Sequence, residues 1–97
     1  MIRVIYRWRV RPGRHAEFIP WWHAGTLRIR ESEPGALGST LCQSSEDREV
    51  FVGIARWEER QHVEAFWKRA GNVGFEGAVL ESMEVIDELD DLTLGGG

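Results

Sequence analysis

The chain has 97 residues and a formal net charge of −4, and its single cysteine, Cys42, excludes an internal disulfide. A chain of this length forms one domain with a modest core. The acidic balance argues against general nucleic-acid binding, which requires a basic face. Five tryptophans and four phenylalanines bring more aromatic surface than a small monomer easily hides, which points to a subunit interface.

No apolar run in the sequence is long enough to cross a membrane. Arginines interrupt the first apolar stretch, so no secretory signal is visible and we expect a cytoplasmic protein. Lys68 is the only lysine among 12 basic side chains, a composition typical of a GC-rich bacterial source.

Residues 2–11 alternate between two kinds of side chain. Because side chains alternate across a strand, this pattern predicts a strand with one apolar face and one guanidinium face. The apolar positions are Ile2, Val4, Tyr6, Trp8 and Val10, and the others are Arg3, Arg7, Arg9 and Arg11, with Ile5 the apolar exception. Residues 1–48 carry eight basic groups and five carboxylates, whereas residues 49–97 carry four and eleven. This asymmetry predicts that the two parts of the chain attract each other.

The rest of the chain predicts two helices and three further strands. Pro20 lies inside the first helix, so we expect either a kink there or a helix that begins near Ile19. Pro34 and Gly35 end that helix, and Gly71 ends the second. In chain order the predicted elements are a helix over 14–31, strands over 36–43 and 49–57, a helix over 58–70 and a strand over 79–89.

The predicted order β-α-β-β-α-β is typical of the ferredoxin-like α+β fold with a four-stranded antiparallel sheet. That topology has the sheet order 4-1-3-2, so the first and last strands are neighbours. The arginine face then meets Glu81, Glu84, Asp87 or Glu88. We expect a single domain over 1–92 and a flexible tail over 93–97.

Three kinds of side chain are candidates for chemistry. His23 and His62 lie on helices near aromatic residues, where a neutral imidazole can act as a base, although boundary histidines without a function have the same pattern. Arg7 and Arg9 can clamp an anionic substrate or pair with the last strand. The three histidines lack the carboxylate or cysteine spacing of a metal site, and we expect neither a metal nor a cofactor.

The sequence resembles the antibiotic-biosynthesis monooxygenase family of the dimeric α/β-barrel superfamily. The resemblance rests on three blocks, which are residues 7–13 with Phe18 and Trp22, residues 34–39, and residues 51–57 with Ala65, Phe66 and Trp67. It implies a homodimer in which two sheets meet face to face, with a cavity between sheet and helices. Members include cofactor-free oxygenases of aromatic polyketides, quinol oxygenases, haem-degrading oxygenases and proteins without a known reaction.

The resemblance implies a cofactor-independent monooxygenase that acts on an aromatic polyketide, phenol or quinol. The catalytic candidates are His62, His23 and Trp57, with Trp57 at a position that matches a functional tryptophan of haem-degrading members; packing in the core is the alternative for Trp57. The candidates for binding the aromatic substrate are Tyr6, Arg7, Trp8, Trp22, Phe66 and Trp67.

Two other functions stay open. The chain lacks the asparagine on the first strand and the histidine after the second helix that complete the haem-degrading triad, which makes haem binding through His23 or His62 the third choice. The second choice is a non-enzymatic dimeric module that binds a small molecule or has a structural role, because the predicted inner faces carry few polar groups.

Overall fold

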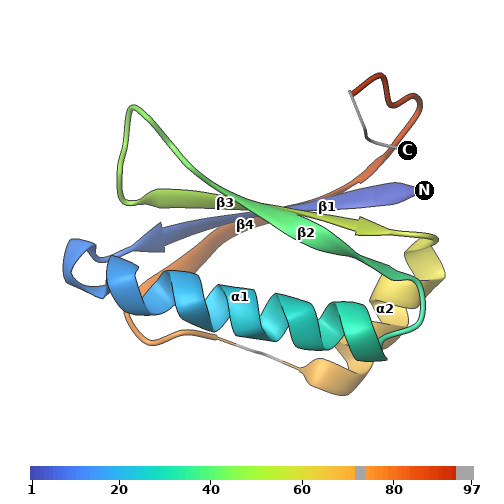
Figure 1. Ribbon diagram of the computed structural model, residues 1–97, viewed down its shortest axis with the longest axis horizontal. Coiled ribbons are helices and arrows are strands. Elements are labelled where there is room, and N and C mark those ends of the chain that lie inside the picture. The colour runs from blue at the N-terminus through green and yellow to red at the C-terminus, as the bar shows by residue number, and fades with distance from the viewer. Residues whose placement is uncertain (72–73, 94–97) are drawn as a thin grey trace.

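A computed structural model describes residues 1–71 and 74–93. Its four strands and two helices follow the predicted order (Figure 1). The elements are β1 (Ile2–Val10), a 3-10 turn η1 (Pro12–Arg14), α1 (His15–Ser32), β2 (Ala36–Gln43), β3 (Val50–Trp57), α2 (Arg60–Ala70) and β4 (Ala78–Asp87). The single domain expected over 1–92 stays a prediction, and most of the expected tail, residues 94–97, lies outside the described residues.

The sheet has the order β2-β3-β1-β4, and every neighbouring pair is antiparallel. Both helices lie on the same side of this sheet (Figure 1). The structure therefore confirms the ferredoxin-like α+β fold and the pairing of the first strand with the last. The other side, which we call the helix-free face, carries no helix of the described chain.

The first helix, α1, does not begin where one of the two expectations placed its start. It begins at His15 and contains Pro20, so a start near Ile19 is wrong. Proline removes one N–H bond and crowds the carbonyl four residues earlier, here that of Ala16. Both Ala16 and Pro20 are exposed, so water can take up the freed carbonyl. Phe18, which is fully buried, anchors the turn between them.

Two apolar clusters fill the space between sheet and helices. The first surrounds α2 and contains Ile2, Val4, Ala55, Trp57 and Val63. The second lies under the start of α1 and contains Val10, Phe18 and Phe51. Both take their β1 members from the predicted apolar face, which confirms the alternation of that strand.

Gly53, in the middle of β3, leaves room on the helix side of the sheet for large aromatic side chains. A Cβ at this position would lie 2.8 Å from Cζ3 of Trp8 and 3.5 Å from Nε1 of Trp22. Glycine fits here because the indole of Trp8 occupies the space of its missing side chain, while Trp22 lies at ordinary contact distance. The result is a direct contact between β1, β3 and α1 at the centre of the sheet.

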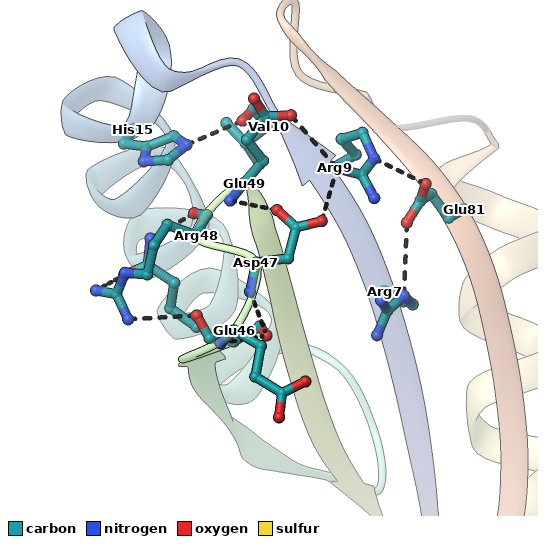
Figure 2. Close-up of polar contacts among 11 residues, drawn as sticks. Arg7, Arg9, Val10, His15, Glu46, Asp47, Arg48, Glu49 and Glu81 are labelled. Atoms are coloured by element: carbon teal, nitrogen blue, oxygen red, sulfur yellow. Dashed lines mark hydrogen bonds and ion pairs between the residues drawn. The ribbon is translucent and has the colours of Figure 1, made fainter.

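The helix-free face carries an ion-pair network centred on Arg9 (Figure 2). Arg9 Nη1 lies 3.0 Å from Asp47 Oδ2 and 3.3 Å from Glu49 Oε1, while its Nε lies 3.0 Å from Glu81 Oε2. Arg7 Nε lies 3.5 Å from the other oxygen of Glu81. The hydrogen bond from Arg9 holds the pKa of Asp47 below its ordinary value, because it favours the charged carboxylate.

At the opposite end of the same face, Arg3 and Arg56 both pair with Glu88, at 2.8 and 3.1 Å. The predicted attraction between the arginine face and the last strand is thus realised through Glu81 and Glu88. Arg7 and Arg9 thus pair with β4, which was the alternative to binding an anionic substrate.

The substitution Gly53→Ala tests the packing at the centre of the sheet. We expect it to lower the free energy of unfolding by about 1–3 kcal/mol, because the added methyl overpacks the contact with Trp8. Chemical denaturation followed by tryptophan fluorescence measures this change. Gly13→Ala is the matched control, since a Cβ there has nothing within 4 Å, and we expect a change below about 0.5 kcal/mol. Equal stability of the two variants would contradict the packing argument.

Candidate functional site

Between the two apolar clusters, β4 is half-exposed on the helix side of the sheet, beside the partly buried rings of Tyr6 and Trp8 of β1. Tyr6 is paired with Met83 and Trp8 with Leu80, and directly opposed residues point to the same side of a sheet. Tyr6 contacts α2 through Trp67, and Trp8 contacts Phe18 of α1, which places all four residues on the helix side. We call Tyr6, Trp8, Leu80 and Met83 the aromatic strip.

The packing of β4 explains why this strip is open. Val85 packs against the first cluster, and Ala78 packs against the second together with Phe75. Leu80 and Met83, which lie between them on the helix side, are about half exposed, at 49% and 45%. Two large apolar side chains exposed beside aromatic rings are typical of a surface that binds an apolar partner or ligand.

A hydrogen bond supplies the polar part of the strip. Trp67 Nε1 donates to the hydroxyl oxygen of Tyr6 over 3.2 Å. Burial raises the pKa of Tyr6 above 10.0, and the hydrogen bond from Trp67 lowers it by less. The phenol is therefore protonated at neutral pH, and because Trp67 occupies only an acceptor position, the hydroxyl keeps its own hydrogen to donate.

The rings around this hydroxyl are held in place by their neighbours. Tyr6 stacks on Trp8 with centroids 5.5 Å apart and an interplanar angle of 12°. Trp8 meets Phe18 edge to face at 5.6 Å. These geometries fix the planes of both rings, so the strip presents a flat and ordered aromatic surface.

The structure brings three of the predicted substrate-binding residues together, which are Tyr6, Trp8 and Trp67. Trp22 lies behind them, where it shares the space above Gly53 with Trp8. Phe66 instead packs on Trp57, with centroids 5.5 Å apart. Trp57 is only 3% exposed and belongs to the first apolar cluster, which is the core position considered as its alternative.

Arg7 lies apart from these residues. It is on the helix-free face, where it pairs with Glu81 (Figure 2), whereas Tyr6 and Trp8 point to the helix side. Within one chain, Arg7 therefore cannot stabilise an anion that rests on the aromatic strip.

The histidines are dispersed around the molecule. His62 packs over Gly35 in the turn between α1 and β2, and its Nδ1 is buried without a hydrogen-bond partner. His23 is exposed on α1. His15 approaches the carbonyl oxygen of Val10 to 2.9 Å through Nε2 and meets Phe51 edge to face. None of the three faces the aromatic strip.

A concave feature elsewhere on the molecule, the edge groove, runs between α1 and the outer strand β2. It encloses about 420 Å³. Its lining combines Ile19, Trp22 and His23 of α1 with residues 39–43 of β2 and Phe51 of β3. The groove and the strip lie over opposite halves of the sheet, because β2 and β4 are its two outer strands.

Gly53, Leu80 and Met83 were not among the predicted site residues. A glycine inside an apolar strand signals close approach of another group, so Gly53 was detectable in principle. The exposure of Leu80 and Met83 was not, because residues three apart point to opposite faces of a regular strand, and only the register shift of β4 opposite Arg7 and Trp8 puts both on the helix side. It arises from tertiary structure, since the two helices pack on either side of them.

Residues 1–71 and 74–93 contain neither a candidate metal site nor a membrane-spanning helix. They contain no group of three histidine, cysteine, aspartate or glutamate side chains placed to hold a metal ion. No helix among them is long and apolar enough to span a membrane.

The fold is shared with several solved structures. The haem-degrading protein MhuD of Mycobacterium tuberculosis, with two haems bound in its active site, has a TM-score of 0.76 and 20% identity, over 96% of this chain and 100% of that chain. An antibiotic biosynthesis monooxygenase has a TM-score of 0.66 and 17% identity, over 93% and 100%. PA3566 of Pseudomonas aeruginosa has a TM-score of 0.56 and 23% identity, over 95% and 94%. Identities this low show a common fold and nothing finer.

No curated protein matches this chain. Residues 1–71 match the family model described as antibiotic biosynthesis monooxygenase. The match runs from β1 through α2 and so includes Tyr6, Trp8, Gly53 and Trp67. Because this model covers most of the chain, the protein belongs to the antibiotic biosynthesis monooxygenase family.

Proposed function

We propose that this protein binds an electron-rich aromatic small molecule, a phenol or quinol, on the aromatic strip and oxidises it with O₂ without a cofactor. One observation carries the proposal. The protonated Tyr6 hydroxyl, held by Trp67 at 3.2 Å, lies beside a stacked aromatic surface and two exposed apolar side chains. A flat apolar area with a single oriented donor suits a planar ring that carries one oxygen.

The reaction needs little from the protein beyond this arrangement. A deprotonated phenol or enol is electron-rich enough to reduce O₂, so substrate and O₂ supply all the electrons. For an anthrone, the ring methylene becomes a carbonyl, one oxygen atom enters the product, and the second leaves as water with the two methylene hydrogens. Tyr6 donates a hydrogen bond to the substrate oxygen, which stabilises the anion that precedes electron transfer.

The positions of His62 and His23 do not support the role of base. Neither imidazole faces the strip, so in this proposal the strip stabilises the anion while water or buffer removes the proton. A rate that rises with pH towards the pKa of the substrate follows from this arrangement, because Tyr6 stays protonated over the same range.

A non-enzymatic binding module is the second candidate. The same dispersion of the three histidines favours it, since the strip has a donor and an apolar surface but no side chain that can remove a proton at neutral pH. Haem as a substrate has less support, because no imidazole is placed at the strip to bind its iron.

We further propose a homodimer in which the helix-free faces of two copies meet. Val79 and Ile86 of β4 are 66% and 37% exposed, and their β1 partners Arg9 and Arg3 place them on that face. Half-buried Ile5 and Ile54 adjoin them. Contact between two such faces would remove these side chains from water.

The protonation state of Tyr6 is directly measurable, because the chain has one tyrosine. We expect ultraviolet titration to give a phenol pKa above 10, and we expect Trp67→Phe to raise it further by removing the hydrogen bond that lowers it. Since burial raises the pKa of the folded state, the stability from this group is complete below pH 10 and falls as pH rises through the folded pKa. An unshifted pKa in the folded protein would contradict the buried donor.

Oxygen uptake and ligand binding with a panel of anthrones, naphthols and quinols test the function. We expect protein-dependent uptake above autoxidation, and about a tenfold weaker binding and slower uptake in Tyr6→Phe, which loses one hydrogen bond to an anion. The double variant His23→Ala/His62→Ala is the matched control and should retain uptake within about twofold.

The outcomes separate the candidates. Tight binding without uptake would establish the binding module. Loss of uptake in the histidine double variant alone would overturn the proposed site and restore His23 or His62 as the base. Absence of both binding and uptake in a folded protein would remove the strip as a ligand site.

A further inference from the structure

The aromatic strip contains one side chain that peroxides oxidise readily, the thioether of Met83. Met83 is 45% exposed, so a peroxide dissolved in water can approach it. The helix side of the sheet also stays open in the proposed homodimer, because that dimer joins the helix-free faces. Oxidation of Met83 would therefore change the surface on which we place the ligand.

Met83 lies directly opposite the residue that supplies the polar group of the strip. Its Cα is paired with that of Tyr6 across the antiparallel ladder, and directly opposed side chains have Cβ atoms about 4.5–5.5 Å apart. Both side chains point to the helix side of the sheet. The methionine side chain is unbranched and flexible, so its end can lean towards its neighbour. A polar atom added to the sulfur thus comes within reach of the Tyr6 hydroxyl.

The Tyr6 hydroxyl can form a hydrogen bond with such an atom. Trp67 Nε1 donates to the hydroxyl oxygen over 3.2 Å, which leaves the phenolic hydrogen available for an acceptor. A thioether sulfur is only a weak acceptor. A sulfoxide oxygen carries a large partial negative charge and accepts strongly. Oxidation of Met83 therefore places a strong acceptor beside the donor of the strip.

We propose that Met83 is a reversible modification site, at which a peroxide forms a sulfoxide whose oxygen accepts the hydroxyl hydrogen of Tyr6. With hydrogen peroxide, the sulfur lone pair attacks one oxygen, so that an S–O bond forms and the O–O bond breaks. The displaced hydroxide takes the proton of the transferred oxygen and leaves as water. Sulfur is oxidised by two electrons and the peroxide is reduced by two.

The modification would weaken the strip as a ligand site in two ways. The sulfoxide occupies the Tyr6 donor that a substrate oxygen would use, and it adds a strong dipole to an apolar surface. This consequence rests on the proposed function, whereas the sulfoxide and its hydrogen bond do not. Because methionine sulfoxide can be reduced again, the loss of binding is reversible.

Met1, the other methionine of the chain, is an internal reference for this chemistry. It is 54% exposed and so about as accessible as Met83. Arg56 Nη2 donates to its sulfur over 3.1 Å, at the end of the sheet where Arg56 also pairs with Glu88. A sulfoxide at Met1 would lie among these charged groups rather than on the strip. Oxidation of Met1 should therefore leave the Tyr6 phenol unchanged.

Titration of the single tyrosine after peroxide treatment tests the modification site. Hydrogen peroxide is added and then removed with catalase, and peptide mass spectrometry measures the sulfoxide at each methionine. We expect a higher phenol pKa than in untreated protein, because the new hydrogen bond favours the protonated phenol. Methionine sulfoxide reductase should restore the original pKa. Met83→Gln, whose amide oxygen is an acceptor, should raise the pKa without peroxide.

Met83→Leu is the matched control, because it retains Met1 and Cys42 but has no sulfur at position 83. Peroxide should leave its phenol pKa unchanged. In the wild-type protein, oxidation should also weaken the binding of phenols and quinols about tenfold, which corresponds to the loss of one hydrogen bond to an anion.

The outcomes distinguish the modification site from the proposed function. A sulfoxide at Met83 with an unshifted phenol pKa overturns the modification site, as does a sulfoxide confined to Met1. An equal shift of the pKa in Met83→Leu also overturns it. A raised pKa in a protein that binds none of the phenols or quinols, before or after oxidation, supports the modification site and overturns the proposed function alone. A raised pKa with unchanged affinity overturns the predicted weakening of the ligand site.

Discussion

The central position of β1 between β3 and β4 makes its alternating side chains the constraint on which both sides of the molecule depend. One set of residues supplies Ile2, Val4 and Val10 to the two apolar clusters. The other set supplies the arginines that pair with carboxylates of β4 and of the β2–β3 hairpin. A shift of one residue in register would bury these arginines beneath the helices, so burial and ion pairing select the same register.

The same strand also places the candidate site. Tyr6 and Trp8 occupy the middle of the apolar face, between the two clusters rather than inside either one. Tyr6 packs against the first cluster and Trp8 against the second, and Gly53 leaves the space that the indole of Trp8 fills. What remains uncovered is the part of β4 that faces them, which is how an ordinary strand comes to expose Leu80 and Met83.

Most of the fold could be predicted because local signals and long-range packing agree. The alternation of residues 2–11, the Pro-Gly pairs and the apolar stripe of α2 each specify an element, and the topology then pairs β1 with β4. The site was less accessible to sequence reasoning. Histidine near an aromatic stripe predicts a base, but the position of His62 depends on the turn at Gly35, and that of His23 on a rotation of about 100° per residue around α1.

The ends of the sheet raise a separate physical problem. An open sheet has two outer strands whose backbone groups can pair with another chain, and proteins commonly protect them. In this protein the segment after β4 is fastened to its own sheet by the ion pairs of Glu88 with Arg3 and Arg56, and two exposed arginines, Arg30 and Arg48, lie at the ends of β2. Charged side chains beside both outer strands disfavour pairing with unrelated strands. The acidic second half of the chain has a structural role here, because its carboxylates neutralise the arginines of the helix-free face.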